Sequence, residues 1–185
     1  MNIINGLING LCLLGIIILL ISFFSKFGNF LDVRSIVKQH LEIFKGNYLQ
    51  MISIFIVPIF FAIRIVLTKT VNEGILNNLN IVLTILITML FSTLSILCSL
   101  RVSNDNEKYH RVLVETFVST VFEALLCLLL MIISFVILFL NNFNNTIEMK
   151  VLSGLVYYLV MIVLLNILVI IKRINVLFEN RPIKD

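Results

Sequence analysis

The sequence predicts an all-α integral membrane protein, a bundle of about five transmembrane helices plus one amphipathic interfacial helix. Of its 185 residues 60% are hydrophobic, and the mean hydropathy is +1.11. Charged residues make up 13% of the chain, against about 25% in an ordinary soluble domain. The longest segment between apolar runs, residues 25–50, is only about half the roughly 50 residues that a folded domain needs. We therefore expect a single transmembrane domain over residues 1–185.

Five apolar runs have about the 17 to 25 residues that are needed to cross roughly 30 Å of hydrocarbon. They cover residues 7–24, 51–67, 81–100, 124–140 and 151–171. The first run could be a signal peptide, but no Lys or Arg precedes it and no small-residue cleavage site follows it. We interpret it as a true membrane span.

The segment between the first two runs predicts an amphipathic helix over residues 33–45. Its apolar residues share one helical face, and its basic residues are Arg34, Lys38 and Lys45. Each basic residue near the surface contributes about 1 kcal/mol toward binding anionic lipid. Two interpretations stay open: a helix that lies on the cytoplasmic leaflet, and a helix that packs under the bundle.

The second run carries a proline and a charge. We expect Pro58 to kink the helix and to free a backbone carbonyl that a neighbouring helix can satisfy. Arg64 lies near the outer end of this run, where its long side chain can reach the outer headgroups. We interpret Arg64 as an interface anchor, and a charged ring in an oligomer is the alternative.

The third run carries a stripe of small polar side chains on one helical face, which we call the hydroxyl stripe. It consists of Asn80, Thr84, Thr88, Ser92, Ser95 and Ser99. Small residues allow close approach of helices, and hydroxyls bond across the contact or back to their own helix. We predict a packing face inside the protomer or between protomers, and the alternative is a water-lined pore.

The last two runs are marked by Glu123, just before the fourth run, and by Asn166, inside the fifth. Glu123 directly precedes the fourth run, so we expect it at the cytoplasmic boundary. Counting back from it in fours gives Ser119, Glu115 and Arg111, which predicts a polar face on a helical extension of this span. Asn166 in the fifth run matches the depth of Ser95, and a hydrogen bond between them would contribute about 0.6 to 2 kcal/mol.

The distribution of basic residues predicts the orientation. On one side lie Lys26, Arg34, Lys38, Lys45, Arg101, Lys108, Arg111, Lys172, Arg173, Arg181 and Lys184. The other side has only Lys69 and Lys150. We expect the N-terminus outside and the C-terminus in the cytoplasm, in what is most simply a bacterial cytoplasmic membrane.

Motifs for enzymatic chemistry are missing from the sequence: there is no HExxH, GxSxG, P-loop or CxxC. We expect neither catalysis nor a cofactor.

His40 and His110 lack ligand partners at metal-binding spacing, so we assign them structural or surface roles. Cys12, Cys98 and Cys127 all lie within apolar runs and are interpreted as packing residues. The basic residues are spread over several loops, which argues against direct nucleic-acid binding.

At the level of architecture the chain resembles the small membrane components of bacterial anti-phage defence systems, such as the Kiwa membrane subunit. The shared features are a length under 200 residues, four or five spans, basic cytoplasmic loops and no soluble domain. The resemblance implies a homo-oligomer that senses or damages the membrane with a cytoplasmic partner, and it transfers no functional residue.

These observations lead to one hypothesis and two alternatives. The hypothesis is a non-enzymatic membrane protein that contacts lipids, oligomerises and binds a cytoplasmic protein partner. The first alternative is an oligomeric pore whose lining is the hydroxyl stripe, with Arg64 or Glu123 as a charged ring. The second is an accessory subunit of a membrane transport complex. Transport by the chain alone is disfavoured by the odd span count and the lack of an inverted repeat.

Overall fold

The computed structural model describes residues 33–45, 48–100, 107–140 and 147–179, and this part of the chain is almost entirely helical. The helices are α2 (Val33–Ile43), α3 (Tyr48–Phe55), α4 (Val57–Thr68), α5 (Glu73–Ser99), α6 (Glu107–Leu140) and α7 (Ile147–Glu179). Four stretches are long and apolar enough to cross a membrane: Tyr48–Thr68, Glu73–Ser99, Glu107–Phe139 and Met149–Glu179. The predicted helical membrane bundle is confirmed, and the run at 7–24 lies outside the described residues.

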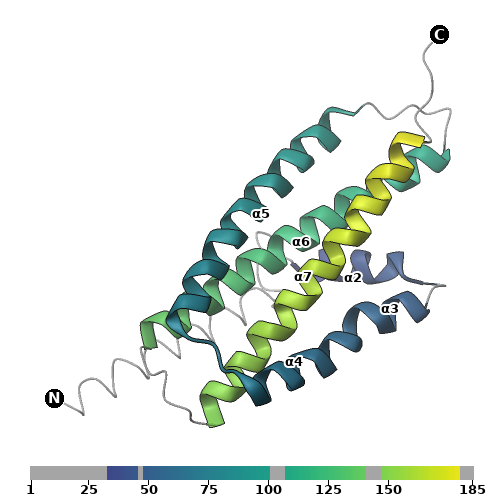
Figure 1. Ribbon diagram of the computed structural model, residues 1–185. Coiled ribbons are helices and arrows are strands. Elements are labelled where there is room, and N and C mark those ends of the chain that lie inside the picture. The colour runs from purple at the N-terminus through teal and green to yellow at the C-terminus, as the bar shows by residue number, and fades with distance from the viewer. Residues whose placement is uncertain (1–32, 46–47, 101–106, 141–146, 180–185) are drawn as a thin grey trace.

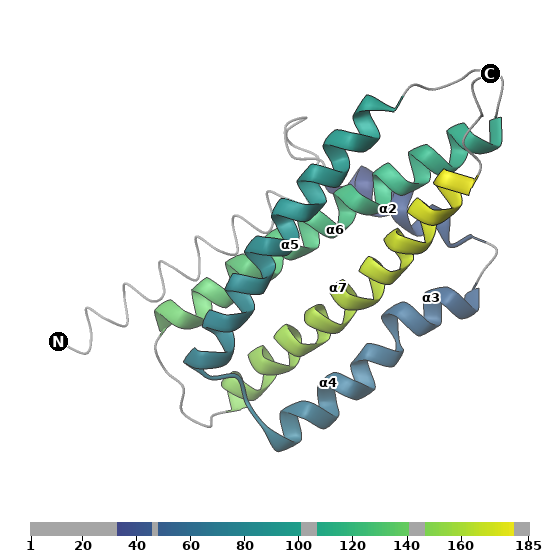
Figure 2. The same cartoon turned by 45° about the horizontal axis from the view of Figure 1, so that its top comes forward.

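Helices α6 and α7 form the middle of the bundle. Helix α5 packs against one side of α6, and α4 packs against α7 on the other side (Figure 1). The same order of α5, α6, α7 and α4 is seen after the molecule is turned (Figure 2). Because α5 packs chiefly on α6, much of its circumference faces away from the other described helices.

A leucine repeat fixes the face that α5 presents to α6. The leucine seam recurs every seven residues and comprises Leu76, Leu83, Leu90 and Leu97, all of which are buried. A seven-residue apolar repeat keeps one face of a helix against its neighbour over many turns. Asn72 caps the start of the helix by accepting a 2.9 Å hydrogen bond from the Ile75 N–H. The seam therefore determines the rotation of α5 about its axis.

Pro58 interrupts the second span as the sequence predicts. The helix breaks at Ile56, and α4 restarts with Pro58 in its first turn. The Ile59 N–H donates to Ile56 O at 3.1 Å, so it does not bond to Phe55 O. The Tyr158 hydroxyl of α7 donates to Phe55 O at 3.2 Å. A side chain of the neighbouring helix thus satisfies the carbonyl freed beside the proline, which confirms that expectation.

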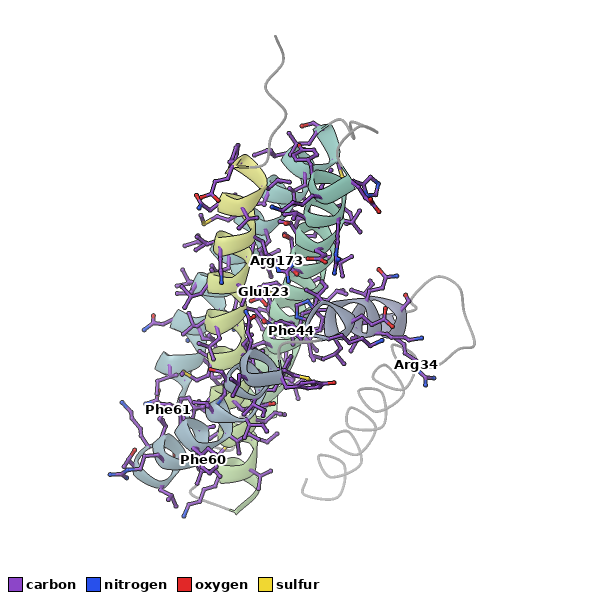
Figure 3. All side chains as sticks on the ribbon, turned by 90° about the vertical axis from the view of Figure 1, so that its right-hand side faces the viewer. Arg34, Phe44, Phe60, Phe61, Glu123 and Arg173 are labelled. Atoms are coloured by element: carbon purple, nitrogen blue, oxygen red, sulfur yellow. The ribbon has the colours of Figure 1, made fainter. Side chains whose placement is uncertain are left out.

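The predicted amphipathic helix is present as α2, and it packs crosswise against α6 (Figure 3). It buries His40, while Phe44 follows directly after its last turn and is also buried. His40 stacks on Phe122 with ring centroids 4.0 Å apart, and Phe44 meets Phe55 edge-on at 6.3 Å. These ring contacts join α2 to both α6 and α3.

Two apolar clusters fill the bundle, one in the long middle section and one at the end where α5 stops and α6 starts. The first includes Leu83, Leu90, Cys127, Leu130 and Val163. The second consists of Leu97, Tyr109, Leu113 and Leu177. Between Leu113 and Ala124 the inward face of α6 is mainly polar, so a polar layer separates the two clusters.

Candidate functional site: a buried polar layer

The polar layer draws its side chains from three helices. It consists of His40 from α2, Thr116, Ser119, Thr120 and Glu123 from α6, and Asn166 from α7, all of them buried. The three hydroxyls each donate to the backbone carbonyl four residues earlier, at 2.7 to 2.8 Å. The side chains of His40, Glu123 and Asn166 have no hydrogen-bond partner of this kind on their own helices. Buried polar groups are normally hydrogen-bonded, so an exception points to a place where function is to be sought.

Glu123 lies near the centre of the 34-residue helix α6 and is 0% exposed. On the neighbouring helix α7, the side chain of Asn166 faces Glu123 and is 1% exposed. No described atom meets hydrogen-bond geometry with either carboxylate oxygen, or with the amide oxygen or nitrogen of Asn166. The sequence analysis expected Glu123 at the cytoplasmic boundary of the span, on a helix that extends before it, and the structure places Glu123 inside the bundle on such a continuous helix.

An ion pair closes the polar layer on the side of the second apolar cluster. The Arg173 Nη1 group on α7 donates to Glu115 Oε2 on α6 at 2.7 Å. The Arg111 Nε–H donates to the other oxygen, Glu115 Oε1, at 2.9 Å. The side chains of Arg173 and Glu115 are 18% and 25% exposed, while that of Arg111 is 81% exposed. The predicted polar face of Arg111, Glu115, Ser119 and Glu123 is therefore confirmed as one continuous helical face.

His40 is the least expected member of the layer. Its ring is 1% exposed, and neither ring nitrogen has a hydrogen-bond partner among the described residues. Burial of the ring and the nearby Arg173 guanidinium lower the pKa of His40 from 6.5 to about 4. The neutral ring therefore predominates at physiological pH, and it serves as a flat packing element between Phe122 and Phe44.

The hydroxyl stripe lies on a different part of the molecule. Thr84, Thr88, Ser92, Ser95 and Ser99 are exposed, and Asn80 is half-buried. The exposed hydroxyls of the stripe do not share the face of the leucine seam, whereas Asn80 lies beside that seam and its side-chain oxygen is buried. The hydroxyls of Thr84, Thr88 and Ser92 donate to backbone carbonyls one turn earlier, at 2.8 to 3.0 Å. The expected partnership of Ser95 with Asn166 does not occur within the described protomer, because Asn166 faces Glu123 instead.

The other singled-out charges lie on the surface. Arg64 is exposed on the last turns of α4, close to the loop that leads into α5. Arg34 and Lys38 are exposed on α2 and Lys45 is exposed just after it, and Arg34 lies at the end of α2 that points away from the bundle (Figure 3). A shallow pocket of about 270 Å³ lies between α2 and α6, lined by Gln39, Glu42, Ile43, Val114, Glu115 and Val118.

Sequence reasoning missed two members of this site. Arg173 was counted only as a topology signal, and His40 only as a surface or structural residue. Both positions follow from tertiary packing: α2 folds back onto α6, and α7 runs antiparallel to α6, which places residue 173 beside residue 115. One feature of the sequence could have indicated these partners. The helical face of Arg111, Glu115, Ser119 and Glu123 is polar, and a polar face that is buried in a bundle needs polar side chains on the neighbouring helices.

Three or more His, Cys, Asp or Glu side chains do not converge anywhere within the described ranges. No protein-family model, no curated protein and no solved structure was found to match the chain.

Proposed function

We propose that this chain is a non-enzymatic membrane subunit that self-associates through the hydroxyl stripe of α5. The observation that carries the proposal is the exposure of Thr84, Thr88, Ser92 and Ser95 on a membrane-spanning helix whose opposite side is already packed. In a bilayer, association of helices depends on close packing and on hydrogen bonds, and both favour Ser and Thr over larger residues.

The arrangement of α5 supports a contact between copies. The helix lies at the edge of the bundle, with α6 as its main neighbour (Figure 1). Beside the stripe lie large exposed apolar side chains such as Ile85, Met89 and Ile96, which suit lipid. The chain therefore has a narrow face of small residues next to a broad face of large ones, and a second copy can approach closely only along the narrow face.

The end of the bundle at which α6 begins and α7 ends is proposed as the cytoplasmic side, and this end together with α2 is proposed as the docking surface for a protein partner. Exposed basic residues lie on these elements: Lys38 on α2, Lys45 just after it, Arg111 on α6, and Lys172 on α7. Anionic lipid headgroups attract such residues as well. A role in bacterial anti-phage defence is part of the proposal, and its support is the architecture of short chain, membrane spans and basic cytoplasmic segments.

The experiment measures the oligomeric state of the purified full chain by native mass spectrometry in mild detergent. We expect an oligomer for the wild type and mostly monomer for the double variant T88L/S92L, because leucine prevents close approach. The matched control is I85L/M89L, which adds no bulk beyond leucine on the adjacent lipid-facing surface and should leave the oligomer intact. Equal oligomer content in both variants would contradict the proposal.

A pore is the alternative assembly on the same face, because back-bonded hydroxyls can also line water. Cysteines that replace Thr88 and Ser92 distinguish the pore from the packed contact. A small charged thiol reagent attacks the thiolate and reaches it only through water. Rapid modification in the assembled protein identifies a wet path, and slow modification identifies a packed contact.

A further inference from the structure

Glu123 and Asn166 form a pair of buried polar side chains in the contact between α6 and α7. Their side chains come from different helices and face each other, and each is at most 1% exposed. None of their four polar atoms, two from the carboxylate and two from the amide, has a partner in good hydrogen-bond geometry among the described residues, although the two side chains are close enough to interact. Figure 3 shows Glu123 inside the bundle near the level at which α2 meets it. The pair is therefore a polar site enclosed by packed helices.

Among the described residues, no cationic side chain forms an ion pair with this carboxylate. Arg173 on α7 is instead engaged by Glu115, to which its Nη1 group donates at 2.7 Å. Glu115 lies eight residues before Glu123, which is about 12 Å along the helix at roughly 1.5 Å per residue. Removing an unpaired carboxylate from water is unfavourable, so a positive charge bound to it would stabilise the folded bundle.

The remaining groups around the pair do not supply that charge. From α2 the neutral ring of His40 stacks on Phe122, and from α6 the nearby titratable side chains are Glu115 and Cys127. Helix α5 carries no titratable side chain between Glu73 and Cys98. Glu123 is thus the one charged side chain on the inward face of α6 between Glu115 and Leu140.

The donor atoms around Glu123 are hard oxygens. Ser119 and Thr120 lie one turn before it and are buried, and their hydroxyl hydrogens are used by the carbonyls of Glu115 and Thr116. Their oxygens keep lone pairs that can accept or coordinate, as does the amide oxygen of Asn166. One carboxylate with neutral oxygens matches a cation of single charge better than a divalent ion, which takes several carboxylates or waters.

We propose that Glu123 and Asn166 form an internal binding site for one monovalent cation, either a proton or a sodium ion. A proton would make Glu123 a donor to the amide oxygen of Asn166. A sodium ion would be coordinated by the Glu123 carboxylate, the Asn166 amide oxygen and the hydroxyls of the preceding turn. The site is separate from the hydroxyl stripe on α5, so it stands independently of the proposed self-association.

The experiment is modification of the purified full chain in detergent with dicyclohexylcarbodiimide, an apolar reagent that adds to a protonated carboxyl group. Mass spectrometry of the α6 peptide reports the adduct at Glu123. For a proton site, the rate falls about tenfold per pH unit once the proton is lost. For a sodium site, NaCl protects Glu123 at fixed pH, and choline chloride at equal ionic strength does not.

Variants test whether the pH dependence or the sodium protection arises from Glu123 and Asn166. E123Q should lose the adduct, whereas E73Q, the same change at an exposed position on α5, should retain it. N166L should weaken sodium protection about tenfold or more, because a hydrogen-bonding or coordinating group to a charge is removed. Modification of Glu123 at a rate independent of both pH and sodium would overturn the proposal.

A second measurement tests the cation site if the carbodiimide does not reach Glu123. The unfolding temperature of the wild type, followed by circular dichroism, should depend on pH or on sodium more strongly than that of E123Q, in which a neutral amide replaces the carboxylate. Equal dependence in the two proteins would overturn the proposal.

Discussion

Arg173 on α7 and Glu115 on α6 form a 2.7 Å ion pair that joins the two central helices at the polar layer. Both side chains are largely withdrawn from solvent, and Glu115 also accepts from Arg111. The two arginines thus share one carboxylate but differ in burial, which makes them a matched pair for mutation.

Replacing Arg173 by methionine should lower the free energy of unfolding by about 1 to 3 kcal/mol, because a partly buried carboxylate loses its interhelical partner. The same replacement at Arg111 should cost less than about 1 kcal/mol, because that side chain is mostly exposed. Unfolding in mixed detergent followed by circular dichroism measures both. Equal losses at the two positions would refute the interhelical role of Arg173.

Acid should weaken the attachment of α2 to α6. Because the pKa of His40 is lowered from 6.5 to about 4, the unfolded or detached segment binds a proton more readily than the docked one. Docking is therefore fully stabilised above about pH 6.5 and loses up to about 3 kcal/mol as the pH falls toward 4. Trypsin cleavage at Lys38 reports detachment. H40F should keep the ring contacts and remove this dependence, while H110F, at an exposed position on α6, should retain it.

The leucine seam should dominate the α5–α6 contact. L83A should lower the free energy of unfolding by about 2 kcal/mol or more, since it leaves a cavity beside α6. I85A on the exposed face should cost clearly less, because lipid or detergent fills the space. A loss for I85A as large as that for L83A would show that α5 is rotated differently about its axis.

The orientation is open to a direct test. Cysteines that replace Lys108 and Lys150 lie at opposite ends of the bundle, near the start of α6 and near the start of α7. In intact cells an impermeant thiol reagent should label the cysteine at position 150 and spare the one at position 108, because most basic residues lie on the side of Lys108. The reverse pattern would mean that the topology is inverted.

The helices and the Pro58 kink could be predicted because they depend on local sequence: apolar length, helical spacing and a missing N–H. The polar face that includes Glu115 and Glu123 followed from the same spacing. Its partners could not be predicted, because Arg173, Asn166 and His40 reach it only through the way that three helices pack. The hydroxyl stripe was recognised from periodicity, but only the leucine seam reveals that it faces outward.

The central claim, self-association through the hydroxyl stripe, is tested most directly by disulfide cross-linking in native membranes. Single cysteines are placed at Thr88, Ser92 or Ser95, and for comparison at the exposed positions Ile85, Met89 or Ile96, in a chain with Cys12 and Cys98 changed to alanine. A disulfide needs Cα atoms within about 7 Å, which only a close helix contact provides. We predict oxidised dimers from the stripe positions and little from the comparison positions. Dimers chiefly from Ile85, Met89 and Ile96, or none from the stripe, would contradict the account.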